Sequence, residues 1–167
     1  MKKFKTIILP IIIGLVAAIL VIWLISSLTT GARSAVEAAA SYLKASMLLD
    51  ADEMVKNASD YTKATLNGGT LSSDKELKEK LNSLYRDAEN TYKGKEIKFK
   101  ITEEREIDMR SEEGAQFIAR YSSHADSSVI TKIALIGITT YCEGNYVQKS
   151  NCYCVMIGGR WYFGYQY

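Results

Sequence analysis

The sequence is poor in the residues that mark several unusual classes of protein. Its 167 residues include one proline, eleven glycines and three cysteines, while 47% are apolar and 24% are charged. The scarcity of proline and glycine excludes a collagen-like or low-complexity disordered chain, and three cysteines are too few for a disulfide-dense miniprotein. The composition is that of an ordinary globular protein.

Acidic residues are absent from the N-terminal part, where the first one is Glu37. The first 31 residues hold three of the 21 basic residues and none of the 19 acidic ones, leaving 18 basic against 19 acidic residues and a formal charge of −1. A nearly neutral domain lacks the basic surface that binds nucleic acid or anionic lipid. We therefore expect no nucleic-acid partner.

Residues 7–28 form an uninterrupted apolar stretch without a charge. As a helix this stretch extends roughly 33 Å, enough to cross a hydrocarbon core of about 30 Å. Three lysines precede it and only Arg33 follows closely, which predicts a cytoplasmic N-terminus. We expect a cytoplasmic tail at residues 1–6, a single-pass transmembrane helix at residues 7–28, and a domain at residues 34–167 outside a bacterial cell membrane. A cleaved signal peptide is the alternative, although its apolar region would span about 7–15 residues.

The first half of this domain has helical patterning. Apolar residues recur at helical spacing over residues 34–49, which predicts an amphipathic helix. A shorter helix is predicted over residues 52–58. Ser73 and Glu76 have the spacing of a capping box and open a third helix, whose apolar stripe continues to Tyr92.

The second half is dominated by strands. Ile97, Phe99 and Ile101 alternate with charged residues, which predicts a strand with one solvent-facing side. A short helix over residues 111–124 and three strands from Val129 onward complete the chain. The predicted order after the membrane helix is α-α-α-β-α-β-β-β, an α+β domain with helices packed on an antiparallel sheet.

A glycine-containing turn determines the expected pairing of the first two of these three strands. A two-residue turn at Gly144-Asn145 pairs Gly137 with Cys152. Because side chains alternate between faces, this register assigns one set of residues to the side covered by helices. This set is Ile133, Leu135, Tyr141, Cys152, Cys154, Met156, Trp161, Phe163 and Tyr165. The other face is mixed, and we expect it to be partly exposed or to contact a partner. It carries Ile136, Ile138, Lys149, Asn151, Tyr153, Val155, Tyr162 and Gln166.

A second turn, at Gly158-Gly159, joins the last two strands. It pairs Met156 with Trp161 and Cys154 with Phe163. We therefore expect Trp161 to face the helices and the neighbouring Tyr162 to face the opposite side.

The three cysteines have no suitable disulfide partner in this register. Cys142 falls on the opposite face from Cys152 and Cys154, which are two residues apart on one strand. Such a pair is separated by about 6.5–7 Å, at or beyond the usual limit for a disulfide. We expect buried free thiols. A metal site at Cys152 and Cys154 and an intermolecular disulfide through Cys142 are the alternatives.

Three segments of the predicted domain have familiar patterns. The first helix begins SAVEAAASYLKASMLLDADEM, the centre reads KFKITEEREIDMRSEEGAQFIARY, and the last hairpin reads Ile157-Gly158-Gly159-Arg160-Trp161-Tyr162. Across about residues 34–165 these segments resemble the nuclear-transport-factor-2-like, cystatin-like domains of small bacterial membrane-anchored or secreted proteins. The resemblance implies a curved sheet around a long helix, with room for a pocket. It implies no single activity, because this fold serves enzymes, binding modules and assembly factors.

Common catalytic motifs are missing from the sequence. There is no phosphate-binding loop, dinucleotide-binding glycine motif, zinc-protease helix motif or nucleophile elbow, and the one histidine, His124, is expected at a solvated helix end. We therefore predict no catalytic residue, no bound metal and no cofactor. Alternation along the first strand brings Glu103 and Arg105 to its apolar side as a pocket-lining ion pair, unless a bulge or the sheet rim turns both into water. The candidate ligand-binding residues are Tyr141, Trp161, Phe163, Tyr165, Glu103 and Arg105.

These patterns fit best a non-enzymatic binding or assembly module that is anchored in the membrane and acts outside the cell. Its expected partners are the lipid bilayer, through the anchor, and another cell-envelope protein or a second copy of the chain. One alternative is a small-molecule pocket, sensory or catalytic, under the sheet. A deep cavity with an inward Glu103 would favour that alternative, whereas a space filled by Trp161 and Phe163 would count against it. The other is an assembly subunit of a type IV secretion or conjugation machine.

Overall fold

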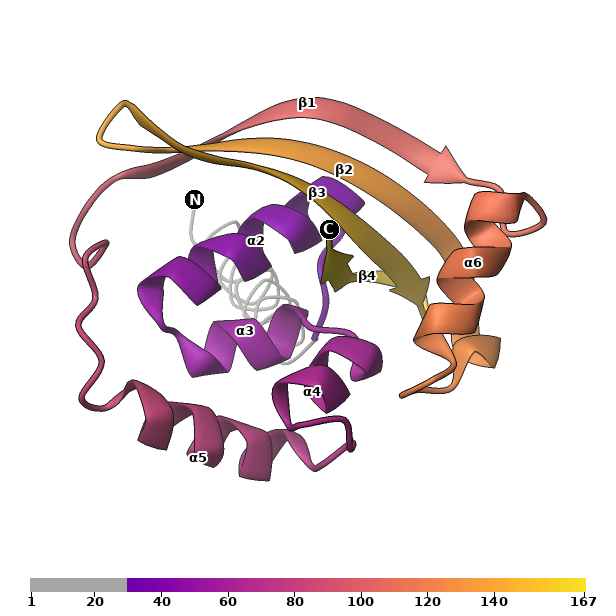
Figure 1. Ribbon diagram of the computed structural model, residues 1–167, viewed down its shortest axis with the longest axis horizontal. Coiled ribbons are helices and arrows are strands. Elements are labelled where there is room, and N and C mark those ends of the chain that lie inside the picture. The colour runs from indigo at the N-terminus through magenta and orange to yellow at the C-terminus, as the bar shows by residue number, and fades with distance from the viewer. Residues whose placement is uncertain (1–29) are drawn as a thin grey trace, which may run out of the picture. The chain divides into compact units, whose positions relative to one another are not determined.

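The computed structural model describes residues 30–167, and this part has the predicted α+β architecture (Figure 1). It contains five α-helices and one four-stranded antiparallel sheet, and Gly31–Tyr167 forms one compact unit. Within the described part, no helix is long and apolar enough to cross a membrane. The cytoplasmic tail and membrane helix predicted at residues 1–6 and 7–28 lie outside the described residues.

Four helices precede the sheet. They are α2 (Ala35–Leu48), α3 (Ala51–Asn57), α4 (Asp60–Leu66) and α5 (Asp74–Tyr85). Each begins after a residue whose side-chain oxygen accepts a backbone N–H of the first turn, which satisfies a donor that the helix itself leaves unpaired. These caps are Ser34, Asp50, Ser59 and Ser73. The capping box predicted for Ser73 and Glu76 is present.

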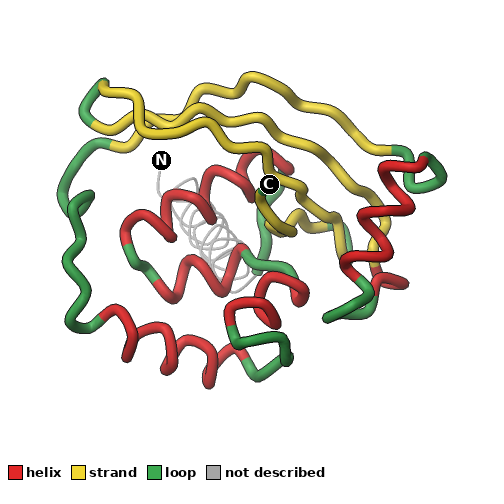
Figure 2. Tube along the Cα trace, in the orientation of Figure 1, coloured by secondary structure: helices red, strands yellow, loops and turns green. Residues whose placement is uncertain are grey.

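The predicted order lacks one helix. The helix expected over residues 52–58 is α3, but α4 follows it directly, because Ser59 adopts an extended conformation and caps a new helix through the N–H of Thr62. The apolar stripe predicted to run to Tyr92 stops at Tyr85, where α5 ends. Beyond Tyr85 the chain no longer packs against α3 and forms a long loop toward the sheet (Figure 2). The observed order is therefore α-α-α-α-β-α-β-β-β.

The sheet is built from strands that neighbour each other in chain order. They are β1 (Ile97–Ile107), β2 (Ile130–Cys142), β3 (Asn145–Ile157) and β4 (Arg160–Gln166). Helix α6 (Glu112–Tyr121), capped by Ser111, and the short 3-10 turn η1 (Ser127–Val129) connect β1 to β2. The sheet arches over α2, while α5 packs on α3 and lies farthest from the sheet (Figure 1).

The turn between β2 and β3 lies one residue earlier than predicted. Glu143 and Gly144 occupy it with φ angles of 51° and 78°, and Asn145 already belongs to β3. The left-handed conformation of Glu143 is held by two bonds to Glu96. The Glu143 N–H donates to the Glu96 carbonyl over 2.9 Å, and the Glu143 carboxylate accepts from the Glu96 N–H. The turn is thereby tied to the start of β1.

This displaced turn and an adjacent bulge shift the pairing of β2 with β3 by one residue. Gly137 pairs with Asn151 instead of Cys152. Because neighbouring residues point to opposite faces, the shift exchanges the two faces of β2. The predicted side is therefore wrong for Ile133, Leu135, Ile136 and Ile138.

The hairpin of β3 and β4 begins in the predicted register. Met156 pairs with Trp161, and Cys154 pairs with Phe163. Trp161 is 9% exposed within the core that contacts α2, and Tyr162 packs against the core on the other side. Both side-chain directions are confirmed.

Farther along β4, a bulge changes the direction of Tyr165. Gly164 has no partner on β3, so Tyr165 pairs with Tyr153 and joins its face. A Cβ atom on Gly164 would lie 2.9 Å from the Tyr153 carbonyl oxygen, and this close approach explains why glycine occupies the bulge. The predicted position of Tyr165 beside Phe163 on the α2 side is therefore wrong.

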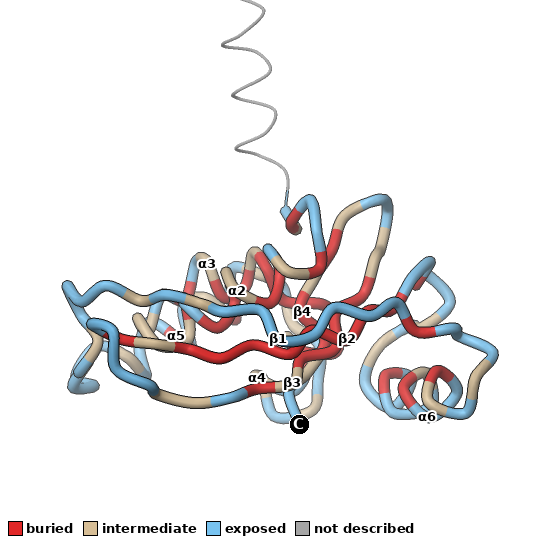
Figure 3. The backbone as a smooth tube through the Cα atoms, turned by 90° about the horizontal axis from the view of Figure 1, so that it is seen from above, coloured by how far each residue is buried: buried red, intermediate tan, exposed pale blue. Residues whose placement is uncertain are grey.

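Each face of the sheet has its own hydrophobic core. On the α2 face, the sheet contributes Ala134, Ile136, Ile138, Cys152, Cys154, Trp161 and Phe163. On the α6 face, it contributes Ile107, Ile130, Ile133, Leu135, Tyr153 and Val155, which pack with Phe117, Tyr121 and Tyr61. The face expected to be partly exposed is thus covered where α6 and α4 reach it. Strand β2 is buried along much of its length, whereas β1 is largely exposed (Figure 3).

All three cysteines are buried and carry free thiols, as predicted. The Cys154 thiol donates a hydrogen bond to the Ala35 carbonyl oxygen over 3.4 Å. Burial raises the pKa of Cys152 to about 12 and that of Cys154 well above its ordinary value. Both thiols are therefore neutral at physiological pH and serve as small apolar side chains.

Candidate functional site

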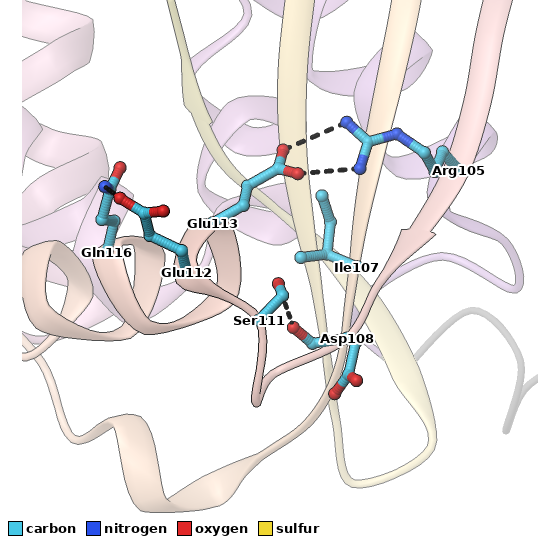
Figure 4. Close-up of a pocket in the computed structure, with 7 residues that line it drawn as sticks. All are labelled: Arg105, Ile107, Asp108, Ser111, Glu112, Glu113 and Gln116. Carbon is cyan, nitrogen blue, oxygen red and sulfur yellow. Dashed lines mark hydrogen bonds and ion pairs between the residues drawn. The ribbon is translucent and has the colours of Figure 1, made fainter.

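Two surface pockets lie at opposite ends of α6, and each contains one arginine. We call the first, where β1 meets the start of α6, the Arg105 pocket (Figure 4). Its volume is about 550 Å³. It is lined by Arg105, Ile107, Asp108, Ser111, Glu112, Glu113 and Gln116.

Each of the three nitrogens of the Arg105 guanidinium donates to a carboxylate. Its two Nη atoms donate to the two carboxylate oxygens of Glu113 over 2.8 and 3.1 Å (Figure 4), and its Nε donates to Glu103 over 3.3 Å. The Tyr153 hydroxyl adds a bond of 2.9 Å to Glu113. Hydrogen bonds from Arg105 hold the pKa of Glu113 below its ordinary value, and those bonds in turn raise the pKa of Arg105. The Arg105–Glu113 pair connects β1 to α6, and the carboxylate neutralises the positive charge of Arg105.

A bulge in β1 decides where this ion pair lies. The pairing with β2 shifts between Ile101 and Glu103, so the residues after the bulge change face. Glu103 and Arg105 do form the predicted ion pair, but their side chains are 46% and 47% exposed and do not enter the core between α2 and the sheet. The alternative in which a bulge turns both toward water is the correct one.

The second pocket is bordered by α2, α4, the end of α6 and β4, and we call it the aromatic cleft. Its volume is about 240 Å³. Its lining residues are Tyr42, Tyr61, Thr62, Thr65, Leu66, Arg120, Phe163, Gly164, Tyr165 and Gln166. Four of these are aromatic and one, Arg120, is charged.

The aromatic rings of the cleft are fixed by the core beneath them. Tyr42 stacks on Phe163 with ring centroids 4.0 Å apart and an interplanar angle of 8°. Tyr61 and Tyr165 approach each other to 5.7 Å. The Thr62 hydroxyl bonds the carbonyl oxygens of Phe163 and Gly164, which fastens α4 to the edge of β4. The cleft is consequently built on buried residues, although its mouth is open.

Arg120 is held at this mouth by two tyrosines. Its Nε donates to the Tyr61 hydroxyl over 3.2 Å, and its Cζ lies 4.3 Å above the centre of the Tyr165 ring. The hydrogen bond that Arg120 donates to Tyr61 raises the pKa of Arg120, so the side chain is cationic throughout the physiological range. No carboxylate within residues 30–167 forms an ion pair with it.

The six predicted ligand-binding residues do not form one site. Phe163 and Tyr165 line the aromatic cleft, but from opposite faces of β4. Trp161 is buried in the α2-side core, with its backbone paired to Ala32. Tyr141 contacts the ring of Tyr146 near the β2–β3 turn, with centroids 6.4 Å apart. Arg105 lines the other pocket, where Glu103 is bonded to it.

The residues that complete the cleft are not predicted from the sequence. Tyr61 is overlooked because α4 is not predicted, and Tyr42 is read only as part of an amphipathic helix. Arg120 had an available signal, because it follows the buried Phe117 by three residues and precedes Tyr121 on a strongly amphipathic helix. That spacing places an arginine beside an aromatic stripe.

The described residues offer no group of three or more histidine, cysteine or acidic side chains that could hold a metal ion. His124 is exposed, with its ring 5.6 Å from that of Tyr61. Comparisons of the chain with protein-family models, curated proteins and solved structures find no match. The resemblance to nuclear-transport-factor-2-like and cystatin-like domains therefore stays a prediction.

Proposed function

We propose that the protein is a membrane-anchored, extracytoplasmic binding or assembly module with a nuclear-transport-factor-2-like or cystatin-like domain and no catalytic activity. The anchor and its orientation are supported by the charge-free stretch at residues 7–28 and the lysines before it. The binding role is supported chiefly by the way the sheet and α2 fit together.

The space between the sheet and α2 is filled by side chains. Ala38 and Ala39 of α2 are fully buried and allow the helix to approach the strands closely. Tyr42 stacks on Phe163, and Trp161 occupies the same core. A ligand beneath the sheet would have to displace these close-packed groups, which favours recognition at the outer surface over a deep enclosed pocket.

The buried nucleophiles also favour binding over catalysis. Thiols act as nucleophiles in their ionised form, and burial raises the pKa of Cys152 to about 12. Cys154 is shifted in the same direction and is fully buried. Neither thiol is in a state suited to attack a substrate.

The buried thiols allow a sharp test of location. A single cysteine at Lys75, whose side chain is 85% exposed on α5, would be the only readily labelled thiol of the outer domain. In intact cells we expect a membrane-impermeant maleimide to label Lys75→Cys, and to label the tail variant Lys3→Cys only after permeabilisation. The wild-type chain is the control for background labelling. The opposite pattern would place the domain in the cytoplasm and overturn the proposal.

A further inference from the structure

Arg120 differs from Arg105 in how it is held at a cavity. Arg105 donates to two carboxylates, whereas Arg120 is fixed by a neutral hydroxyl and a neutral ring. A guanidinium carries five N–H donors. The bond from Nε to Tyr61 uses one of them, and no carboxylate of the described part accepts from the four on the Nη atoms. The charge is positioned but not compensated.

The planar arrangement of the Nη donors of Arg120 indicates which chemical group of a ligand could bind to them. A guanidinium presents two parallel N–H groups that match the two oxygens of a carboxylate or phosphate. Stacking on Tyr165 and the bond to Tyr61 limit its rotation, so less conformational entropy is lost when an anion binds. Among the described residues, Arg120 is the only charged one that lines the cleft. A single positive charge matches a singly charged carboxylate better than a phosphate dianion.

The remainder of the cleft indicates what carries the carboxylate. The aromatic residues Tyr42, Tyr61, Phe163 and Tyr165 are among those that line it. Rings of this kind favour stacked or edge-on contact with another aromatic group. The volume of 240 Å³ corresponds to about eight water molecules, which is enough for one ring with a short substituent. Thr65 and Gln166 add neutral polar groups to the lining.

We propose that the aromatic cleft is a binding site for a carboxylate carried on an aromatic group, with Arg120 pairing with the carboxylate and the ring lying among the tyrosines. The ligand is either a free small molecule or the C-terminal residue of a peptide, since both present the same chemistry. This site rests on the proposed binding function. The experiment below measures ligand affinity, whereas the maleimide labelling measures on which side of the membrane the domain lies. The two can therefore fail separately.

The test uses the full chain in lipid nanodiscs and equilibrium dialysis with N-acetyl-L-phenylalanine. The amide of the same compound, which lacks the charge, is the matched ligand control, and empty nanodiscs correct for partitioning. We expect the acid to bind at least about tenfold more tightly than the amide, because hydrogen bonds to charged groups are the stronger ones. Equal binding of acid and amide, or no binding of the acid, would overturn the proposal.

Two arginine variants separate the site from a general effect of charge. Arg120→Gln should remove the preference for the acid, while Arg105→Gln, which removes the same charge at the other end of α6, should retain it. Circular dichroism of both variants checks that they remain folded. An equal loss in the two variants would contradict the assignment of the site, and tighter binding of phenyl phosphate than of the acid would contradict the ligand class.

A further arm distinguishes the two sources of the carboxylate. An eight-residue peptide ending in phenylalanine is compared with N-acetyl-L-phenylalanine, and its C-terminal amide is the control. Tighter binding of the free-acid peptide would support a peptide terminus as the ligand. Exclusion of the peptide, with the small acid still bound, would support a free small molecule. Tighter binding of the amidated peptide would contradict the role of Arg120.

Discussion

The Arg105 pocket and the aromatic cleft each place one arginine beside α6, but their surroundings use the charge in opposite ways. Arg105 is paired with Glu113 and Glu103, so its donors serve to connect β1 with α6. Arg120 is held by Tyr61 and Tyr165, which orient its guanidinium without neutralising it. The larger pocket is therefore the less suited to an anion, and the smaller one has the available charge.

This difference shows that pocket size alone does not identify a binding site. Removal of a structural ion pair affects mainly folding, whereas removal of an oriented, uncompensated charge affects mainly binding. Substitutions at the two arginines and at the residues beneath them can separate these effects.

The largest effect is expected at the floor of the aromatic cleft. Phe163 is 4% exposed and stacks on Tyr42 in the α2-side core. Phe163→Ala should lower the free energy of unfolding by about 3–5 kcal/mol, because it leaves a cavity. Gln116→Ala, at an exposed lining residue of the Arg105 pocket, should change it by no more than about 0.5 kcal/mol. Denaturation of the full chain in detergent measures both. Equal losses would mean that the cleft is not built on the core.

A smaller, pH-dependent effect is expected at the Arg105 pocket. Arg105 holds the pKa of Glu113 below its ordinary value of 4.5. A carboxylate with a depressed folded-state pKa stabilises the protein above its unfolded pKa, and this contribution is lost as the pH falls through the folded pKa. Arg105→Gln should therefore destabilise the protein at pH 7 and have a smaller effect near pH 3.

Arg120→Gln is the matched control for this pH dependence. No carboxylate of the described part pairs with Arg120. The destabilisation caused by Arg120→Gln should therefore not decrease between pH 7 and pH 3, unlike that caused by Arg105→Gln. Thermal unfolding at the two pH values compares the variants. A pH-dependent loss of stability for Arg120→Gln, with none for Arg105→Gln, would contradict the assignment of the structural ion pair to Arg105.

A small effect on stability is expected for Tyr61→Phe. This change removes the hydroxyl that accepts from Arg120 but keeps the buried ring. Unfolding should change by about 1 kcal/mol or less, as is typical of one hydrogen bond. Binding of N-acetyl-L-phenylalanine should weaken several-fold in dialysis, because Arg120 is less well oriented. A large loss of stability with unchanged binding would show that the hydroxyl serves the fold and not the site.

Local signals in the sequence predict much of this fold. The three helices predicted to begin near residues 34, 73 and 111 do begin there, and the predicted capping box of Ser73 is present because a cap acts on its own first turn. The Gly158-Gly159 turn gives the right register near it, because two residues with positive φ suit a tight hairpin.

The errors arise where distant contacts decide the local geometry. Glu143 occupies the β2–β3 turn because Glu96, 47 residues earlier, binds it. The bulges beside Glu103 and Gly164 reverse the faces of the residues after them, and no simple alternation rule reveals a bulge. Since Arg105 and Tyr165 both follow a bulge, these two are assigned to the wrong face, whereas Phe163, the third predicted site residue that lines a pocket, precedes the bulge and is assigned correctly.

The most direct test of the difference between the two arginines is nuclear magnetic resonance of their side-chain Nε–Hε groups. The full chain in nanodiscs is titrated with N-acetyl-L-phenylalanine, and the two signals are assigned with Arg105→Lys and Arg120→Lys. We predict that the Arg120 signal shifts with added acid and does not shift with the amide, while the Arg105 signal stays in place. A shift of Arg105 with a stationary Arg120 would contradict the account.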